Sequence, residues 1–432
     1  MNVFRARIFT PLGSPFSTPD LRSTYAYFDD GYLAVADDGS IESIGDWQSR
    51  PHRLSEEPLV EFGENIIISP GFVDTHLHAP QLEMIGSYGG HLLEWLARYT
   101  FPTEAKFADE HYARSIGRAL FDELLRNGTT TALIFSSVHA RATGVLFEEA
   151  ERRGFRAIIG KALMDRNAPE NLLESAADAY ENSRALILQW HKHEMLRYAI
   201  SPRFAPTSTP ELLEVAGTLK REFPDVYVHT HVSENRAEVD WVAELFPESG
   251  SYVDVYDRAG LLDQRSVLAH GVHLTDGELE VLSERQARLS HCPNSNLFLG
   301  SGLFPMNRVV KAGVVFGLGS DIGAGTTPSL FNAMSDAYKV QQVLGTSLSP
   351  FHLWYLATLG GAAALLLDAF TGSLERGKDA DFVALDLNGS PLLARRTANA
   401  SLIEDLLAGL IFLGDERIVS RTFIKGEEVS AR

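Results

Sequence analysis

Cysteine is almost absent from this sequence. Cys292 is the only one among 432 residues, so no disulfide can form within the chain, and a reducing cytoplasm suits such a protein. A zinc site built from several cysteine thiolates is excluded for the same reason. Any metal site must therefore draw on histidine and carboxylate ligands.

Basic charge and long apolar runs are also scarce. The chain has 38 Lys and Arg against 57 Asp and Glu, a net charge of -19, with no basic tract. Such a chain repels polyphosphate, which argues against nucleic-acid and anionic-membrane partners. No apolar run is long enough to span a membrane. The start, MNVFRARIFTPLGSP, lacks the apolar core of a signal peptide, so we expect a cytoplasmic protein.

Short strands and turns characterise both ends of the chain. The stretch YLAVADDGSIESIGD breaks apolar segments with Asp-Gly, which indicates a hairpin. Similar patterns return in GKDADFVALDLNGS and TFIKGEEVSAR. They predict a small β-sandwich-like companion domain built from residues 1–65 and 376–432. The alternative is a terminal strand pair that simply packs on the main body.

The middle of the chain alternates between strand and helix patterns. Thr209 and Pro210 begin one helical stretch, and Thr275 with Glu278 forms a capping box at another. This alternation predicts an α/β fold, a parallel (β/α)8 TIM barrel over residues 66–375. Its eight strand candidates are NIIISPGFVDTHLH, TTALIFSSV, RAIIGKALMD, LRYAISPRF, VYVHTH, SVLAHGV, ARLSHCP and VVFGLGSD.

Polar side chains stand where five of these strands end. In a (β/α)8 barrel the chemistry lies at the carboxyl ends of the strands. A single strand-end histidine is more often a hydrogen-bonded structural residue than a ligand. Five strands that deliver such groups to one rim favour a functional site. The residues are His76, His78, Arg203, Phe204, His231, His270 and Asp321.

Four of these residues form a candidate metal site. His76 and His78 are two apart on one strand, so they share a face and can converge on one ion. With His231 and Asp321 they supply three imidazoles and a carboxylate. That set suits zinc with a water molecule completing its coordination.

Other histidines and carboxylates have weaker claims. His191 and His193 lie where a helix ends and point in different directions, so we expect a solvated helix end. His229 shares a face with His231 but lies deeper in the strand, where a packing role is expected. Glu234, three residues after His231, is either a first-turn helix glutamate or a proton shuttle beside a bound water. The sequence assigns no role to His139, His273 and His291, and we expect Cys292 to be a small buried apolar residue.

Several ordered motifs resemble a known enzyme superfamily. PGFVDTHLH, HVSE, AHGVHL and GLGSDIGAG, in that order, resemble the amidohydrolases. HAPQ, LLEWLARYTFPTE, MDRNAP, PRFAPTS, THVSEN and NLFLGSGLF are similar to its guanine-deaminating members. The motifs cover about residues 66–330, and the ordered set is far more specific than any one of them.

The resemblance implies a role for each residue of the site. One Zn2+ per chain would be bound by His76, His78, His231 and Asp321. Glu234 would carry the proton, His270 would polarise the reacting water, and Asp321 would help the amine to leave. The strand that ends in Arg203 lacks the modified lysine with which binuclear relatives bridge two metals, although Lys161 lies on a neighbouring strand. The purine contacts would fall on Gln81, Arg203 and Phe204.

The resemblance also implies an activity, zinc-dependent hydrolysis of guanine to xanthine and ammonia in purine catabolism, and a homodimer. An alternative keeps the metal site but acts on another aminated heterocycle, such as a triazine, cytosine or an adenosine analogue. A non-catalytic scaffold is a third reading, but its lost ligands would show as missing His or Asp, and all are present.

Overall fold

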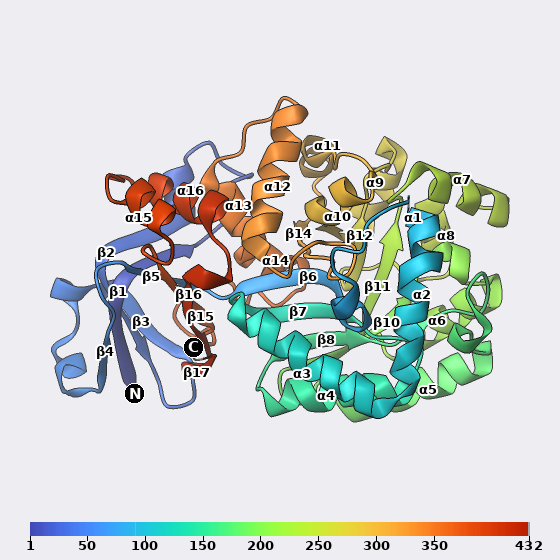
Figure 1. The fold of residues 1–432 in the computed structure, drawn as a ribbon, viewed down its shortest axis with the longest axis horizontal. Coiled ribbons are helices and arrows are strands. Elements are labelled where there is room, and N and C mark those ends of the chain that lie inside the picture. The colour runs from blue at the N-terminus through green and yellow to red at the C-terminus, as the bar shows by residue number, and fades with distance from the viewer. Residues whose placement is uncertain (91, 431–432) are drawn as a thin grey trace. The chain divides into compact units, whose positions relative to one another are not determined.

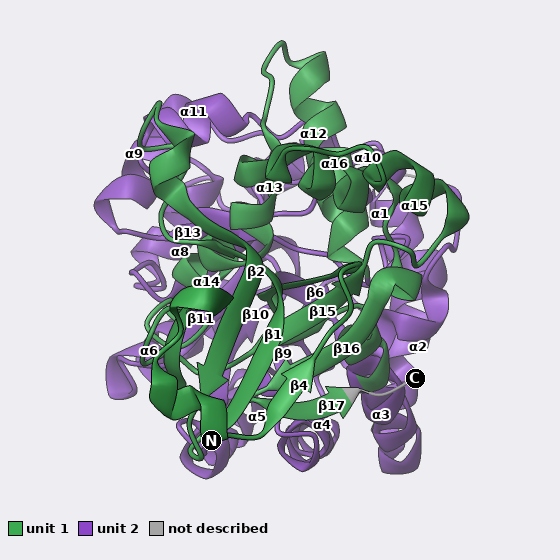
Figure 2. Ribbon diagram, turned by 90° about the vertical axis from the view of Figure 1, so that its left-hand side faces the viewer, with its two compact units in different colours: residues 1–74, 122–131, 329–432 green, residues 75–121, 132–328 purple. Residues whose placement is uncertain are grey.

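The computed structural model describes residues 1–90 and 92–430 (Figure 1). The chain forms two compact units, which Figure 2 distinguishes by colour. The first unit comprises residues 1–74, 122–131 and 329–432, and the second comprises 75–121 and 132–328. The predicted boundary between residues 375 and 376 falls inside the first unit, and the two predicted domains stay a prediction.

One eight-stranded sheet joins the two ends of the chain in the first unit. Its order is β17-β16-β15-β5-β1-β2-β3, and β4 pairs with β1. The predicted hairpin is present as the antiparallel pair β2 and β3. The strands are β1 (Asn2–Pro11), β2 (Tyr25–Val35), β3 (Ile41–Asp46), β4 (Leu59–Glu61), β5 (Ile66–Pro70), β15 (Phe382–Asp386), β16 (Val419–Ile424) and β17 (Glu427–Ser430).

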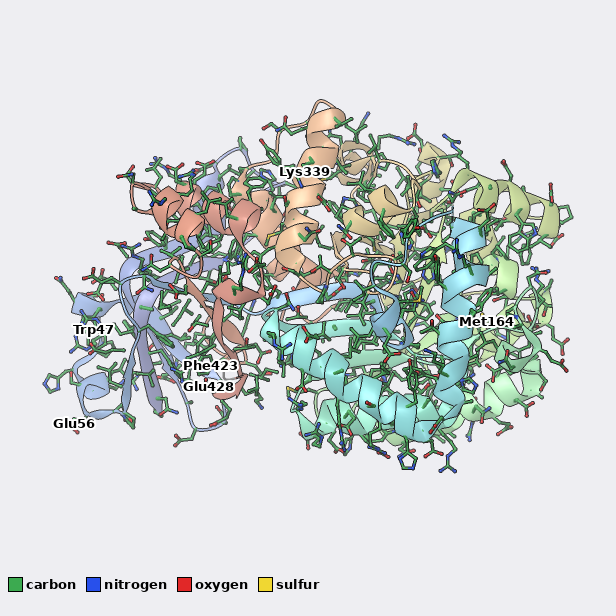
Figure 3. The ribbon with its side chains drawn as sticks, viewed as in Figure 1. Trp47, Glu56, Met164, Lys339, Phe423 and Glu428 are labelled. Atoms are coloured by element: carbon green, nitrogen blue, oxygen red, sulfur yellow. The ribbon has the colours of Figure 1, made fainter. Side chains whose placement is uncertain are left out.

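Aromatic side chains from distant parts of the sequence form the core under this sheet. Phe382 stacks on Phe423 with ring centroids 4.3 Å apart, and Phe4 packs edge-on against Phe382 at 5.0 Å. Figure 3 labels Phe423 among the side chains of this unit. Burying such rings removes large apolar areas from water and holds the two termini in one unit. Its helices are α12 (Leu330–Val343), α13 (Pro350–Ala357), α14 (Leu359–Ala364), α15 (Pro391–Thr397), α16 (Ile403–Leu413), and the 3-10 helices η1 (Leu21–Thr24), η2 (Trp47–Ser49), η3 (His52–Glu56) and η9 (Glu416–Ile418).

The predicted parallel barrel is present. Its strands follow the order β14-β13-β12-β11-β10-β8-β7-β6, with β9 paired to β10, and every pair for which a register is resolved is parallel. In Figure 1 these strands lie beside one another with helices outside them. They are β6 (Phe72–His78), β7 (Thr129–Phe135), β8 (Arg156–Gly160), β9 (Ala162–Leu163), β10 (Leu196–Pro202), β11 (Tyr227–Val232), β12 (Ser266–His270), β13 (Arg288–His291) and β14 (Phe316–Leu318).

The first predicted barrel strand needs a correction. NIIISPGFVDTHLH is two strands, because β5 pairs with β15 and β1 in the terminal sheet while β6 begins the barrel. Gly71 stands between them. A Cβ there would lie 2.2 Å from Oγ1 of Thr130, so only glycine allows this close approach of chain segments.

The helices between barrel strands begin as their sequences predict. The Thr209 side chain accepts a hydrogen bond from the Leu212 amide at the start of α6, and Thr275 with Glu278 forms a capping box at α9. Among the described residues, no helix is both long and apolar enough to cross a membrane. The helices are α3 (Glu110–Arg126), α4 (Ala140–Arg152), α5 (Ala176–Trp190), α6 (Pro210–Glu222), α7 (Arg236–Leu245), α8 (Tyr252–Arg258), α9 (Asp276–Glu284), α10 (Pro293–Phe298), α11 (Met306–Lys311), and the 3-10 helices η4 (Ala79–Met84), η6 (Ala105–Ala108), η7 (Glu170–Leu172) and η8 (Ala205–Thr207).

A further helical segment contributes to the apolar wall of the site. It consists of α1 (Leu92–Trp95), one π-helical turn, η5 (Leu96–Thr100), and α2 (Phe101–Glu104). Trp95 and Leu96 are buried in one cluster with Phe135, Phe204 and Met164, the last labelled in Figure 3. This burial fixes the segment against the barrel strands.

Candidate active site

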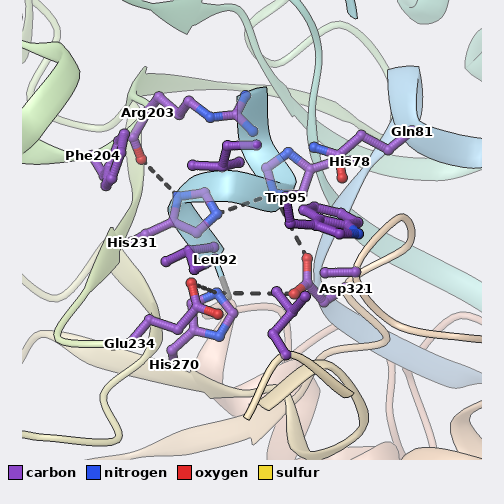
Figure 4. Close-up of a pocket in the computed structure, with 13 residues that line it drawn as sticks. His78, Gln81, Leu92, Trp95, Arg203, Phe204, His231, Glu234, His270 and Asp321 are labelled. Carbon is purple, nitrogen blue, oxygen red and sulfur yellow. Dashed lines mark hydrogen bonds and ion pairs between the residues drawn. The ribbon is translucent and has the colours of Figure 1, made fainter. Parts of the chain in front are cut away.

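Three barrel strands bring the four predicted metal ligands together. His76 and His78 come from β6, His231 from β11, and Asp321 follows β14. Oδ1 of Asp321 lies 3.3 Å from Nε2 of His76 and 3.7 Å from Nε2 of His78. Nε2 of His78 lies 3.0 Å from Nε2 of His231. Figure 4 shows His78, His231 and Asp321 pointing toward one another in the pocket.

The chemistry of these four side chains fits a divalent cation. Burial lowers the pKa of His76, and lowers those of His78 and His231 well below the usual value, so the imidazoles are neutral. Burial alone would raise the pKa of Asp321, but its hydrogen bond with His76 and the charge of the nearby His270 lower it, so the carboxylate is ionised. Neutral imidazoles and an ionised carboxylate are the forms that bind metals.

One tautomer is fixed by the main chain. Nδ1 of His231 donates to the carbonyl oxygen of Arg203 at 2.6 Å, so Nε2 of His231 carries a lone pair. That lone pair faces Nε2 of His78, and a cation is the partner that both nitrogens can share. The site therefore fits zinc, whose usual ligands are these donor types.

His229 does more than pack the barrel interior. It is fully buried, as its depth in β11 predicts, and its Nε2 lies 2.7 Å from Nδ1 of His76. This contact fixes the orientation of the His76 ring and leaves the Nε2 of His76 facing Asp321. The sequence offers one sign of this role, a histidine two residues before a candidate ligand on the same strand.

Five other histidines that the sequence analysis considered lie outside this set of contacts. His191 and His193 both follow the end of α5. His193 is exposed and pairs with Glu151, as a solvated helix end predicts, but the His191 side chain is only 7% exposed and accepts a hydrogen bond from the Tyr198 amide, so that prediction is wrong for His191. The remaining three have separate partners: Nδ1 of His139 lies 3.0 Å from the Ser137 hydroxyl, Nε2 of His273 lies 2.8 Å from the Ser301 carbonyl, and His291 stacks on Phe304.

Glu234 lies before a helix instead of in its first turn. Asn235 is the N-cap of α7, so the first-turn position considered for Glu234 is wrong. Its Oε1 accepts a hydrogen bond from the Ser301 hydroxyl at 2.9 Å, and its Oε2 lies 3.6 Å from Nε2 of His270. Burial raises the pKa of Glu234 to about 7. A carboxyl group with that pKa can both take and give a proton near neutral pH.

His270 connects the two carboxylates of the pocket. Its Nδ1 donates to Oδ1 of Asn296 at 2.9 Å, and its Nε2 lies 3.6 Å from Glu234 and 3.9 Å from Asp321. Burial lowers the pKa of His270, but the two carboxylates raise it by more, so the pKa lies above its usual value. Both His270 and Asp321 have positive φ, 75° and 51°, a strained backbone of the kind found at functional sites.

The predicted purine contacts line the same pocket. Gln81 lies in η4 directly after β6, and Arg203 with Phe204 follows β10. The pocket encloses about 390 Å³ of empty space, counting its open mouth, and Leu92 and Trp95 form part of its apolar wall. Figure 4 shows Gln81, Arg203 and Phe204 in the same pocket as His78, His231 and Asp321.

A buried glutamate that the sequence did not single out joins two of these residues. Glu104, which ends α2, accepts hydrogen bonds from Nε2 of Gln81 at 2.8 Å and from Nη1 of Arg203 at 2.7 Å. Its stretch, LLEWLARYTFPTE, belongs to the recognisable motifs, but nothing in the pattern distinguishes Glu104 from an ordinary helix glutamate.

Cys292 lies beside the candidate metal ligands, whereas Lys161 does not line the pocket. Cys292 is fully buried, as expected, and its sulfur lies within 4.8 Å of donor atoms of His76, His270 and Asp321. Lys161 pairs with Glu174, and it is absent from the residues that line the pocket.

Comparison with known proteins shows the family of this chain. It matches the amidohydrolase family over residues 67–429. The chain belongs to the amidohydrolase family. The guanine deaminase of Escherichia coli (strain K12) is 45% identical over 413 residues, which cover 96% of this chain and 94% of the relative. A solved structure of E. coli guanine deaminase has a TM-score of 0.96 at 42% identity, covering 100% of both chains.

Two further solved structures that are similar to this chain bear on the site. The guanine deaminase of C. acetobutylicum, with guanine bound in the active site, has a TM-score of 0.91 and 31% identity over 99% of this chain and 100% of that one. An adenosine deaminase from Xanthomonas campestris with bound zinc has a TM-score of 0.85 and 25% identity over 99% of this chain and 92% of that one.

Proposed function

We propose that this chain is a metal-dependent hydrolase that converts guanine to xanthine and ammonia. One observation carries the proposal: His78, His231, Asp321, Arg203 and Gln81 all line a single pocket. Metal-binding groups and purine-reading groups are thus within reach of one small substrate. The family and the relatives that are named guanine deaminases support the same activity.

The metal in this proposal is one zinc ion per chain, held by His76, His78, His231 and Asp321. Their mutual distances and protonation states support it, as does the zinc in the X. campestris relative. When bound, zinc supplies Lewis acidity, which makes water a nucleophile at neutral pH.

Glu234 is proposed to move the first proton. Ser301 donates a hydrogen bond to its Oε1. The second oxygen, Oε2, faces His270 and is the one proposed to take the proton. Ionised Glu234 takes a proton from the attacking water and delivers it to ring nitrogen N3 of the purine. This transfer removes the aromatic stabilisation that resists attack at C2, the carbon that bears the amine.

Asp321 and His270 are proposed to complete the reaction. The lowered pKa of Asp321 keeps it ionised until the water reacts, and it then accepts the next proton and helps to pass it to the leaving amine. His270 is held by Asn296 and turns its Nε2 to both carboxylates, so it stabilises the charge that develops between them. Ammonia leaves, and xanthine remains.

Arg203 and Gln81 are proposed to read the base. The Arg203 guanidinium only donates hydrogen bonds, so it fits the O6 carbonyl of guanine. Adenine has an amine at that position, and its approach would place a donor against a donor. Phe204 is 5% exposed beside Arg203 and contributes an aromatic ring to the pocket wall, where it contacts the flat purine.

A substrate panel tests the proposal. Metal-loaded protein is given guanine, adenine, cytosine and an aminated triazine, and ammonia is measured for each. Guanine is expected to be the best substrate. A triazine or cytosine turned over faster than guanine would favour the alternative, in which the same metal site serves another aminated heterocycle.

Assembly and location complete the proposal. A homodimer is the state that the family resemblance supports, and light scattering of the purified protein tests it by giving either one or two chain masses. The single cysteine, Cys292, is buried, so nothing in the chain requires an oxidising compartment, and we propose the cytoplasm.

A further inference from the structure

Glu104 holds both residues that are proposed to read the base. Nε2 of Gln81 donates to its Oε1 at 2.8 Å, and Nη1 of Arg203 donates to both of its oxygens, each at 2.7 Å. All three residues are almost fully buried: 0% of Glu104, 1% of Gln81 and 3% of Arg203 is exposed. Glu104 itself is not one of the residues that line the pocket.

A carboxylate fixes which end of the Gln81 amide faces the pocket. An amide side chain has one donating end and one accepting end, whereas an ionised carboxylate only accepts. The nitrogen of Gln81 must therefore face Glu104. Oε1 of Gln81 is then left as an acceptor, and it is buried with no hydrogen-bond partner among the described residues. A buried acceptor of this kind costs free energy unless a ligand satisfies it.

The chain also leaves room for that oxygen. Gly323, in the loop after Asp321, has φ +115°, and a Cβ at this position would lie 2.0 Å from Oε1 of Gln81. Any side chain there would displace the amide. Glycine at position 323 thus leaves room for the end of the Gln81 side chain, while the bond to Glu104 decides which end of the amide points there.

Arg203 is held by one nitrogen only. Both bonds to Glu104 leave from Nη1, so the carboxylate orients the planar guanidinium while its other donors stay outside this contact. Arg203 presents donors and Gln81 presents an acceptor, side by side on Glu104. The O6 carbonyl and the neighbouring N1–H of guanine form the complementary acceptor and donor.

We propose that Glu104 is a positioning residue that sets the hydrogen-bond polarity of the base-reading pair, Gln81 and Arg203. The inference rests on the proposed function and deepens it. Adenine presents a donor at C6 and an acceptor at N1, the reverse pattern. By holding Gln81 as an acceptor, Glu104 makes the pocket reject that reversed edge at two atoms instead of one.

Glu104→Gln tests this role because the new side chain has the same shape but can both donate and accept. The Gln81 amide can then turn and offer its donor to N1 of adenine. The probes are hypoxanthine, which has O6 and N1–H, and adenine; neither carries the C2 amine. Their Kd values are measured by calorimetry on zinc-loaded protein, so the readout does not depend on turnover.

The matched control is Glu94→Gln, a glutamate of the same helical segment that is exposed and does not line the pocket. In the unchanged protein and in the control, hypoxanthine is expected to bind at least about tenfold more tightly than adenine, since one mispaired buried group costs that much. In Glu104→Gln this ratio should fall at least about fivefold, with zinc content close to that of the control and unfolding still cooperative, at a lower temperature because the Arg203 charge stays buried without its carboxylate.

Two results would overturn the role of Glu104. An unchanged ratio with both ligands weakened equally would make the residue purely structural. Loss of zinc or of the cooperative unfolding transition in Glu104→Gln would likewise show that it holds the fold. The proposed function fails separately: protein that prefers hypoxanthine to adenine but releases no ammonia from guanine would contradict the activity and leave the role of Glu104 supported.

Discussion

Replacing Glu234 by glutamine should abolish most of the activity without disturbing the site. Glutamine has the shape of glutamate, and its amide oxygen can still accept the 2.9 Å hydrogen bond from Ser301. It cannot take a proton from water at neutral pH. We therefore expect the fold and the bound metal to remain while the first proton transfer is lost.

The size of the loss follows from the role of the residue. A general acid–base group contributes about 10²–10⁴-fold to a rate, which corresponds to about 3–5 kcal/mol in the activation barrier. Because Arg203 and Gln81 are unchanged, KM should change little and kcat should carry the effect. Xanthine formation is followed by its absorbance, and zinc per chain is measured in the same sample.

The pH profile gives a second readout for Glu234. Burial raises its pKa to about 7, and the group must be ionised to act as a base, so activity should fall as the pH drops. A cation held by the neighbouring ligands favours the ionised form, which places this fall at or below pH 7. The acidic fall should be absent from the residual activity of Glu234→Gln.

Ser301→Ala is the matched comparison. The hydroxyl lowers the pKa of Glu234, so its removal should move the acidic fall to higher pH and reduce kcat only about tenfold. If Glu234→Gln kept a kcat near that of the unchanged protein, Glu234 would not be the proton carrier, and Asp321 would be the first residue to examine.

Three other predictions concern the metal and the base. His78→Ala should lower zinc per chain itself, because a ligand is removed; full zinc content by elemental analysis would contradict this assignment. Arg203→Ala should keep its zinc but lose at least about tenfold in kcat/KM for guanine, and it should lower the stability by about 3–5 kcal/mol in chemical unfolding because Glu104 is left buried and unpaired. Loss of zinc in that variant would instead give Arg203 a role in holding the barrel. Guanine should exceed adenine at least about tenfold in kcat/KM, and equal turnover of the two would end the substrate assignment.

The barrel and its rim could be predicted because parallel strands have a simple rule. Each buried strand runs to the same edge, so a polar residue at a strand end marks that edge wherever it falls in the sequence. His76, His78, His231 and Asp321 lie up to 245 positions apart in the chain numbering, and the structure brings their donor atoms within a few ångströms. The position of each residue at a strand end is enough to predict that they meet, without any sign in the sequence that one residue pairs with another.

The supports of the site could not be predicted in the same way. Glu104 ends a helical segment, Asn296 lies in α10, and Ser301 follows that helix, so none of them stands at a strand end. Their roles depend on how helices and loops pack over the rim. No repeating sequence pattern predicts that packing. The break between β5 and β6 was missed for a related reason: Gly71 interrupts an apolar run only because Thr130 approaches it in space.

The most direct test of the account is the stoichiometry of guanine hydrolysis by the zinc-loaded protein. Ammonia and xanthine are measured together as guanine is consumed, with and without removal of the metal by a chelator. The account predicts one ammonia and one xanthine for each guanine, loss of both on chelation, and their return when zinc is added back. Guanine left intact by protein that contains its zinc would contradict it.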